Sequence, residues 1–216
     1  MILRKLINNY HKKQTVKKIL DKVTLAGNIP EVTDTTSVRL KYGSSKKDII
    51  VQNNVMLLGC TIVSLCEGKV LLGNYSKLGQ GTKIFCVDKI VIGDFTAIAT
   101  NVTIVDNNNH PVNPEFRQYM RTTPHSSDAR SWIHSDHKPV IIGRNCWIGS
   151  DVRIQKGVTI GDNAIIAACS VVTKDVPANC IAAGNPARIV KTDIDKIPAP
   201  TSCKEFNDYK AQKDGK

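Results

Sequence analysis

An aliphatic side chain returns at every sixth position in one stretch of this chain, and no other feature of the sequence constrains the fold as strongly. The residues of this first register are Ile142, Ile148, Ile154, Ile160, Ile166 and Val172. A second register, four residues later, holds only small or apolar side chains: Cys146, Val152, Val158, Ala164, Ser170 and Val176. A helix repeats about every 3.6 residues and a strand every two, so neither explains the pattern. A coil of short strands joined by tight corners does.

The repeat predicts a triangular prism whose flat faces are short parallel strands, with one hexad per face and three hexads per turn. Each first-register side chain points inward and stacks on its equivalents above and below, so neighbouring turns bury the core together. The register is also present, with one shift of two residues, at Leu72, Leu78, Ile84, Ile92, Ile98 and Ile104. From about residue 32 to 71 it is imperfect, which predicts irregular first turns that cap the prism.

Between Leu72 and Lys191 the sequence resembles the hexapeptide-repeat acyltransferases. The resemblance rests on the hexads, on His110-Pro111, on Trp147-Ile148-Gly149-Ser150, and on the ending from Thr173-Lys174-Asp175-Val176-Pro177 to Asn185-Pro186-Ala187-Arg188. These motifs are similar to those of the galactoside and maltose O-acetyltransferases and of the O-acetyltransferases of sialic acid-containing capsular polysaccharides. The resemblance implies an all-β fold, a left-handed parallel β-helix, and a homotrimer.

The chain is expected to contain three segments. Residues 1–30 form an N-terminal basic helical segment, residues 31–191 form the β-helix domain with a protruding loop at 107–139, and residues 192–216 form a short C-terminal tail. The loop is rich in Pro, Asn, Ser, His and Arg and lacks the sixfold return, so we interpret it as an unstructured excursion with a function. The tail is expected to pack loosely or to be partly disordered.

The N-terminal segment is basic and amphipathic. Residues 1–22 carry seven Lys or Arg against one acid, with apolar residues at helical spacing: Ile2, Leu3, Leu6, Ile7, Ile19 and Leu20. Such a helix can lie on an anionic membrane surface, or it can pack on the prism or on a neighbouring subunit. The segment lacks the apolar core of a signal peptide, and no run reaches membrane-spanning length. We therefore expect a cytoplasmic enzyme, peripheral to the inner membrane if this helix binds lipid.

The formal charge of +11 means that the surface attracts anions. Charge alone does not distinguish nucleic acid, anionic lipid and a phosphorylated cofactor, and the motifs favour the cofactor over nucleic acid. The seven cysteines are odd in number and lack a paired metal-type spacing. We interpret them as mostly reduced thiols packed in the interior.

His110 is the candidate general base. Transfer of an acyl group from a thioester to a hydroxyl needs a base that works near neutral pH, and imidazole suits that task. A lone His is more often a surface or capping residue. In the galactoside and maltose O-acetyltransferases, however, a His-Pro dipeptide at the start of such a loop supplies the base, and His110-Pro111 resembles it. Asp106 is predicted to orient the His110 ring by accepting a hydrogen bond from its other nitrogen.

Trp147 stands at an outward hexad position, where an indole is costly to leave in water. The resemblance implies that Trp147 orients His110 or lines the acceptor site, and packing under the loop is the alternative. The resemblance also implies that the backbone N–H of Ser150 faces the thioester carbonyl, where a fixed donor stabilises an oxyanion.

The C-terminal repeats carry the predicted acetyl-CoA site. In the resembling enzymes a pantetheine arm runs along the prism, which implies contacts to backbone groups and to cations that bind phosphate. The residues implied are Ser150, Ala168, Thr173, Lys174, Arg188 and Lys191. A solvated basic face is the alternative. Ala167 and Cys169 stand where the family usually has glycine.

We therefore expect an acetyl-CoA-dependent O-acetyltransferase that transfers acetyl directly, in a ternary complex, to a sugar hydroxyl of a bacterial surface polysaccharide such as a capsule or O-antigen. On the loop, Arg117, Arg121 and Arg130 are predicted to contact an anionic glycan, although a solvated loop explains each of them as well. N-acetylation of an amino sugar or an antibiotic stays open, as does a non-catalytic β-helix.

A zinc enzyme like the γ-class carbonic anhydrases is a further alternative. It would need three ligands, for which His110, His134 and His137 are the candidates, but two of these lie in the loop. This alternative would also leave the cofactor-type C-terminal repeats unexplained. We therefore expect no metal site.

Overall fold

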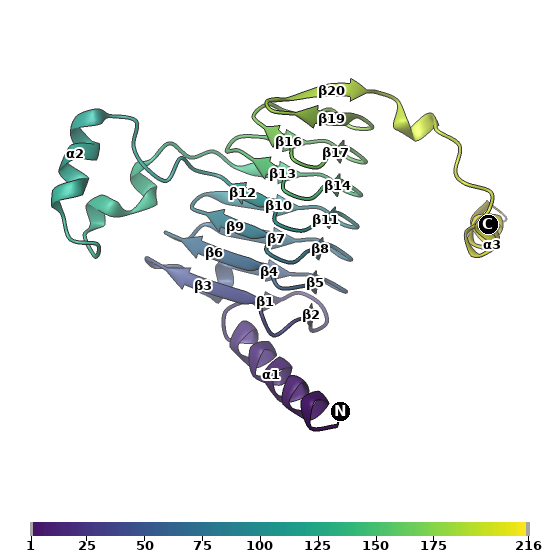
Figure 1. Ribbon diagram of the computed structural model, residues 1–216, viewed down its shortest axis with the longest axis horizontal. Helices are drawn as coiled ribbons and strands as arrows, with labels where there is room; N and C mark the ends of the chain where they lie inside the picture. Colours follow the sequence, from purple (N-terminus) through teal and green to yellow (C-terminus); the bar gives the residue numbers. More distant parts are fainter. Residues whose placement is uncertain (1, 215–216) are drawn as a thin grey trace.

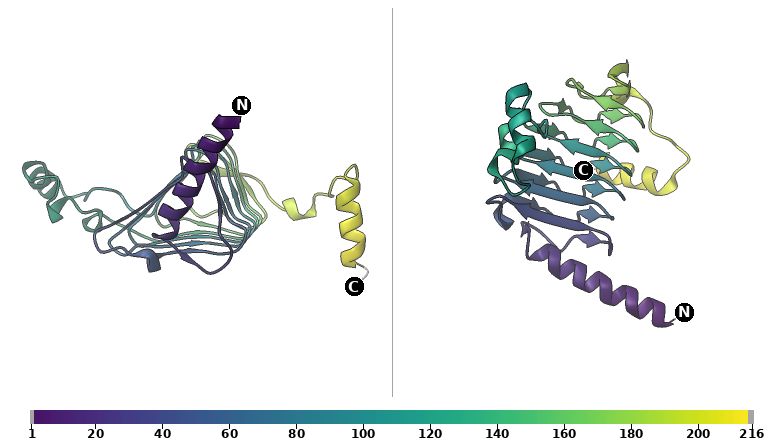
Figure 2. Two further views of the ribbon diagram at one scale, coloured as in Figure 1. Left: turned by 90° about the horizontal axis from the view of Figure 1, so that it is seen from below. Right: turned by 60° about the vertical axis from the view of Figure 1, so that its left-hand side comes forward.

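The computed structural model describes the backbone of residues 2–214 and the side chains of residues 10–213. Its strands form three sheets, here called sheets A, B and C, which are the faces of a triangular prism (Figure 1, Figure 2). Sheet A contains β1 (Thr24–Leu25), β4 (Ile49–Val51), β7 (Lys69–Leu72), β10 (Lys89–Ile92), β13 (Val140–Ile142) and β16 (Thr159–Ile160). Sheet B contains β2 (Glu31–Val32), β5 (Met56–Leu57), β8 (Lys77–Leu78), β11 (Ala97–Ile98), β14 (Trp147–Ile148), β17 (Ile165–Ile166), β19 (Ile181–Gly184) and β20 (Ala187–Lys191). Sheet C contains β3 (Ser37–Lys41), β6 (Thr61–Leu65), β9 (Lys83–Cys86), β12 (Thr103–Val105), β15 (Arg153–Ile154) and β18 (Val171–Val172).

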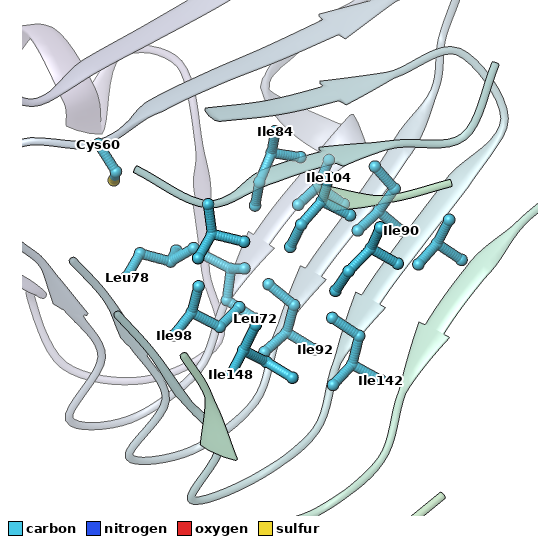
Figure 3. Close-up of a cluster of buried hydrophobic side chains, with 14 of the residues drawn as sticks. Cys60, Leu72, Leu78, Ile84, Ile90, Ile92, Ile98, Ile104, Ile142 and Ile148 are labelled. Carbon is cyan, nitrogen blue, oxygen red and sulfur yellow. The ribbon is translucent and has the colours of Figure 1, made fainter. Parts of the chain in front are cut away.

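In each coil the chain passes through sheets A, B and C in turn, and successive coils pair in parallel. In sheet B, for example, Ile98 pairs with Ile148 and Ile148 with Ile166. These first-register side chains are fully buried, and Figure 3 shows side chains from successive coils meeting in the interior. Burial stabilises the fold by about 1.5–3 kcal/mol for each large aliphatic side chain. The predicted all-β fold, a left-handed parallel β-helix, is confirmed.

The N-terminal coils differ from the prediction because they are longer than three hexads, while their strand pairing is regular. The first coil begins with β1, before the predicted domain boundary at residue 31. Ile50 pairs with Leu71, and Leu71 with Val91, so sheet A is continuous through this region. Much of the extra length lies in sheet C, where β3 and β6 have five residues each and β15 and β18 have two.

Helix α1 (Ile2–Leu20) lies at the end of the prism formed by the first coil and projects away from it toward the N-terminus (Figure 1). Ile19 is buried in the core, and Lys22 Nζ donates to Val38 O at 2.8 Å. The last turns of α1 therefore pack on the prism, which is one of the two interpretations above. The side chains of the predicted apolar residues at positions 2, 3, 6 and 7 lie outside the described residues. Among the described residues, no helix is both long and apolar enough to cross a membrane.

The predicted loop at 107–139, here called the arm, is a folded insertion between β12 and β13. It contains α2 (Pro114–Thr122) and two short 3-10 helices, η2 (Asp128–Arg130) and η3 (Trp132–His134), so the expectation of an unstructured excursion is wrong. The Asn113 side chain caps α2 by accepting from Phe116 N at 2.8 Å. At the base of the arm, Asn107 and His137 form an antiparallel bridge. The arm projects from the corner between sheets C and A (Figure 2).

The other short elements lie at a corner and at the C-terminal end. The 3-10 helix η1 (Lys46–Asp48) joins β3 to β4. After the antiparallel pair β19 and β20, the tail contains η4 (Ile194–Lys196) and α3 (Lys204–Asp214). The described side chains of α3 are exposed. The tail is thus loosely packed, as expected, but it is helical over half of its length.

The seven cysteines are free thiols. Cys60, Cys86, Cys146 and Cys180 are buried in the prism, as predicted. Burial raises the pKa of the Cys60 thiol to about 12, and it raises the pKa of Cys86 as well. A thiol that stays protonated is a weak nucleophile, so these cysteines act as packing residues.

Candidate active site

His110 lies near the base of the arm, where its imidazole is exposed to solvent. The backbone before it is tightly turned: Asn109 has φ of +64°, its N–H donates to Asn107 Oδ1 at 2.9 Å, and His110 N donates to Asn108 O at 2.7 Å. Asn tolerates this left-handed conformation better than most residues. Among the described residues, the imidazole has no hydrogen-bond partner, so both ring nitrogens can reach a substrate.

Asp106 does not orient the His110 ring as predicted. Its carboxylate is fully buried and accepts hydrogen bonds from Val87 N at 2.9 and 3.0 Å, from Asp88 N at 2.8 Å, and from Asn107 Nδ2 at 3.0 Å. Since these donors occupy both oxygens, Asp106 joins the base of the arm to the turn between β9 and β10. It can affect His110 only by fixing the backbone from which the arm starts.

The three predicted acceptor-binding arginines have different environments on the arm. The Arg130 guanidinium donates to Thr123 O through Nε at 3.0 Å and through Nη2 at 2.7 Å. Arg117 donates through Nη1 to Val112 O, and the Arg121 side chain is exposed. Arg130 and Arg117 therefore brace the arm itself, with part of each guanidinium still open to other partners.

Trp147 projects outward from β14, and 59% of its surface is exposed. In the register of sheet B its neighbours are Ala97 on one side and Ile165 on the other. The same column continues to Ile181 and Lys191. Packing under the arm is excluded for Trp147 within one chain, because it lies on a different face of the prism.

Ser150 and Ala168 lie next to each other at the corner between sheets B and C, one coil apart. Cys169 N donates to Ser150 O at 2.9 Å, and Thr100 Oγ1 donates to Ser150 Oγ at 3.0 Å. Within the described part of the chain, the backbone N–H groups of Ser150 and Ala168 donate no hydrogen bond. A Cβ added at Gly149 would lie 2.6 Å from Ala168 N, so a glycine here lets the two coils pack closely.

Cys169 follows at the same corner with φ of +60°, and it is exposed. Glycine adopts this conformation without strain, which explains why glycine is usual here in the resembling enzymes. The exchange therefore adds a side chain next to the N–H groups of Ser150 and Ala168 without changing the path of the backbone.

The predicted cofactor cations fall at two places. Arg188 and Lys191 are exposed on β20, where Arg188 pairs with Ala183 and lies at the same corner as Ala168. Thr173 and Lys174 are exposed after β18, at the corner between sheets C and A. Among the described residues, none of these three cations forms an ion pair, so each is free to bind a phosphate.

One chain thus brings its predicted site residues together in two separate groups. The first group, here called the sheet B group, contains Trp147, Ser150, Ala168, Arg188 and Lys191. The second group, at the corner that carries the arm, contains His110, Arg117, Arg121, Arg130, Thr173 and Lys174. Figure 1 shows the arm on one side of the prism and strands β8, β11 and β14 on the other. His110 and Trp147 therefore do not meet within one chain.

The histidines proposed as zinc ligands do not converge. His134 Nε2 lies 3.0 Å from Asp128 Oδ2, and His137 Nδ1 lies 2.9 Å from Ser135 O. Across the part of the chain that the structure describes, no group of three or more His, Cys, Asp or Glu side chains is placed to hold a metal ion. The geometry gives no support to the carbonic anhydrase-like alternative.

Trp132 had no role in the predictions above, although it joins the arm to the prism. Its ring packs edge-on against Phe85, with centroids 5.6 Å apart. It covers a cluster of buried side chains on the outer face of sheet C that includes Val63 and Leu65. The sequence signal was present: a Trp in a polar segment usually marks a contact that buries it.

Comparisons with known proteins agree with this architecture. Residues 139–174 match the family model described as bacterial transferase hexapeptide (six repeats). The galactoside O-acetyltransferase of Escherichia coli (strain K12) is 42% identical over 125 residues, which are 57% of this chain and 52% of that protein. The chain therefore spans about half the length of this curated relative. The resemblance to hexapeptide-repeat acyltransferases is confirmed.

Two solved structures share the fold at low sequence identity. The polySia specific acetyltransferase NeuO superposes with a TM-score of 0.56 at 23% identity, over 89% of this chain and 99% of that chain. AntD, an N-acyltransferase from Bacillus cereus in complex with dTDP and 3-hydroxybutyryl-CoA, superposes with a TM-score of 0.64 at 20% identity, over 94% of this chain and 97% of that chain. At such identities the likeness shows the fold alone.

Proposed function

We propose that this chain, whose residues 139–174 belong to the bacterial transferase hexapeptide family, is an acetyl-CoA-dependent acetyltransferase that acetylates a sugar hydroxyl. The observation that carries the proposal is an exposed imidazole, His110, held on a folded arm in a chain whose opposite face has, among the described residues, backbone N–H groups without acceptors beside cations without ion pairs. The galactoside O-acetyltransferase relative supports a hydroxyl acceptor.

In this proposal acetyl-CoA binds along the sheet B group. The N–H groups of Ser150 and Ala168, which have no acceptor among the described residues, donate to an extended chain that lies along this corner, and Arg188 and Lys191 bind the phosphates. Thr173 and Lys174 lie one corner away and contact the far end of the cofactor. This set of donors and cations fits a thioester carried on a phosphorylated nucleotide.

The chemistry is a direct transfer. His110 takes the proton of the acceptor hydroxyl as the oxygen attacks the thioester carbonyl. The negative charge that forms on the carbonyl oxygen is stabilised by the N–H of Ser150. The intermediate then collapses, the C–S bond breaks, and the CoA thiolate takes the proton from His110, which returns the imidazole to its neutral form. No residue is acetylated in this scheme.

A second copy of the chain completes the site. A general base has to lie within hydrogen-bond reach of the proton that it abstracts, about 2.6–3.2 Å. In one chain the arm, which carries His110, and strand β14, which carries Trp147, lie on different sides of the prism. We infer that the arm of one subunit reaches the sheet B group of its neighbour in a homotrimer. This arrangement would place Trp147 next to the imidazole, where it orients the ring or the sugar.

The acceptor is proposed to be a bacterial surface polysaccharide, such as a capsule or O-antigen, or its precursor. The protein would then act in the cytoplasm, and a basic N-terminal helix could hold it near an anionic membrane. The fold likeness to an N-acyltransferase keeps an amino-sugar acceptor as the second candidate. The His110-Pro111 and Trp147 motifs favour the hydroxyl.

The test is thiol release from acetyl-CoA by the purified protein with a panel of neutral, acidic and amino sugars. We expect release that depends on a hydroxyl acceptor, and a kcat about 10²–10⁴-fold lower for His110→Ala. His125→Ala, which removes another exposed imidazole of the same arm, serves as the matched control and should retain full activity. Equal release by His110→Ala and the wild type would rule out the proposed base.

A further inference from the structure

A cavity of about 340 Å³ lies between the arm and the outer face of sheet C. Arg39 and Lys41 on β3 line one side, and Arg130 on η2 lines the other. This cavity, here called the anion pocket, contains none of the residues assigned above to acetyl-CoA or to the base. Its volume falls in the range of small-ligand sites, about 300–1,000 Å³.

The pocket exists because the outward columns of sheet C change character from coil to coil. Outward positions lie two residues apart along a strand. Arg39 pairs with Val63 and Val63 with Phe85 in one column, and Lys41 pairs with Leu65 in the next. Trp132 of the arm packs on the cluster that contains Val63 and Leu65, whereas Arg39 and Lys41 in the first coil are exposed. The first coil therefore presents its two cations beside a wall of apolar side chains.

The charge in this pocket is unbalanced. No Asp or Glu lines it, and within the described part of the chain neither Arg39, Lys41 nor Arg130 forms an ion pair with a carboxylate. Arg39 and Lys41 also have no hydrogen-bond acceptor there, whereas Arg130 is held by Thr123 O. Three cations that converge without an acid bind an anionic group by charge-assisted hydrogen bonds.

The remaining walls are aromatic and apolar. Phe85 and Trp132, which pack edge-on, line the pocket, and so does Tyr42, which has 51% of its surface exposed. A free phosphate or a simple carboxylate would leave these walls in contact with water. A ring that carries the anionic group would cover them and bury apolar surface as well.

We propose that the anion pocket binds a sugar ring bearing a carboxylate or a phosphate group. The proposal deepens the function above and partly rests on it: the pocket holds an anionic unit of the acceptor glycan on the same arm that carries His110. Binding itself does not depend on acetyl transfer. A nucleotide and a neutral sugar are the competing occupants, and the experiment separates them.

The experiment measures fluorescence of Trp132. The chain has two tryptophans, so the Trp147→Phe variant leaves Trp132 as the single reporter inside the pocket. The protein is titrated with glucuronate, glucose 6-phosphate, glucose, inorganic phosphate and CoA, without acetyl-CoA. We expect glucuronate or glucose 6-phosphate to change the emission with an affinity at least about tenfold above that of glucose and of inorganic phosphate. Which of the two binds more tightly identifies the anionic group.

Arg39→Gln and Lys41→Gln, made in the same background, should each weaken this binding by about tenfold or more. Arg153→Gln removes another exposed arginine from the outer face of sheet C and should leave the affinity unchanged. Arg130 is not used, because its substitution would also release the carbonyl of Thr123. Both test positions are exposed, and circular dichroism serves to check that the variants are folded.

Equal affinity for glucose and glucuronate, or binding that Arg39→Gln does not weaken, would overturn the inference. Binding by CoA that Arg39→Gln abolishes would overturn it too, because the pocket would then be a nucleotide site. If binding fails while acetyl transfer to a neutral sugar persists, this inference falls and the proposed function stands. If an anionic sugar binds in the pocket while thiol release is absent, the proposed function falls and this inference stands.

Discussion

The arm and the outer face of sheet B both hold polar groups in fixed positions, but they depend on different kinds of contact. Trp147 and Ser150 stand on coils whose neighbours repeat the same backbone above and below. His110 stands on an insertion whose position depends on a few individual contacts, chiefly the buried carboxylate of Asp106 and the packing of Trp132 on Phe85. The coils are therefore expected to unfold cooperatively, and the arm is expected to unfold locally.

The largest effect should come from combining the two regions across subunits. His110→Ala and Trp147→Ala are each expected to be nearly inactive. When they are co-expressed, about three quarters of randomly assembled trimers contain both variants, and each of these has one intact site in three. The mixed trimers should therefore recover about a third of the wild-type activity. The measurement is the specific activity of the mixed trimers, purified through two different affinity tags.

A mixture of trimers assembled separately is the control and should stay inactive. If the mixed trimers are no more active than the single variants, His110 and Trp147 do not form a shared site, and the division of the active site between subunits is wrong.

The second prediction concerns core packing in the coils. Ile148→Ala removes a fully buried side chain of sheet B and should lower the free energy of unfolding by about 2–5 kcal/mol. Ile133→Ala is the matched change on the arm, where 36% of the side chain is exposed, and should cost less than about 0.5 kcal/mol. Urea unfolding followed by circular dichroism measures both. Equal losses would mean that the arm is part of the cooperative core.

The third prediction concerns the base of the arm. Asp106→Ala leaves the N–H groups of Val87 and Asp88 without their acceptor, and each orphaned buried donor costs about 1–3 kcal/mol. We expect kcat to fall with stability, because the backbone that carries His110 loses its anchor. Asp128→Ala removes an exposed carboxylate of the arm, so it should change neither quantity by a measurable amount. Full activity in a folded Asp106→Ala protein would show that other contacts position His110.

The smallest effect is expected at Asp48, near the corner that carries the arm but in the first coil. Burial of Asp48 opposes its ionisation, yet hydrogen bonds from Lys69 and Ser45 outweigh burial and hold the pKa of this carboxyl below its ordinary value. A carboxyl with a lowered folded-state pKa contributes stability above its unfolded pKa of about 3.9, and that contribution is lost as the pH falls through the folded value. Asp48→Asn should therefore lose stability at neutral pH and approach the wild type in acid.

Thermal unfolding between pH 7 and pH 3 measures this difference. Asp193→Asn serves as the comparison, because Asp193 also has a lowered pKa, through Lys196, but is exposed. An exposed pair contributes little to stability. A difference between wild type and Asp48→Asn that does not shrink in acid would assign the stabilisation to packing and not to charge.

The sequence predicted the later coils well because their period is visible in the side chains. Ile142 pairs with Ile160, an interval of three hexads, and each first-register residue is buried as expected. In the earlier coils the interval from Ile50 to Leu71 is longer than three hexads, so the sixfold return is lost although the pairing persists. Helix α2 was missed despite a local signal, since Asn113-Pro114 is a typical N-cap followed by proline at the first helical position.

The parts of the site that could not be predicted depend on contacts between distant segments. Asp106 was recognised as important, but its donors lie on the turn before β10, and no spacing in the sequence indicates that encounter. The same holds for the anion pocket, which depends on the pairing of Arg39 with Val63 and on the packing of Trp132 against Phe85. Local patterns identified residue types, whereas strand register decided which of them meet.

The pairing around the arm has one consequence for how such a chain can diversify. β10 pairs with β13, and β12 pairs with β15, so the coils on either side of the insertion are aligned without help from the arm. The segment between Asn107 and His137, which form a bridge with each other, is therefore expected to be replaceable by another insertion. A chimera that receives the arm of another protein, of a different length, should still fold and keep the sheet B group unaltered. Its acceptor preference should then be that of the protein from which the arm was taken.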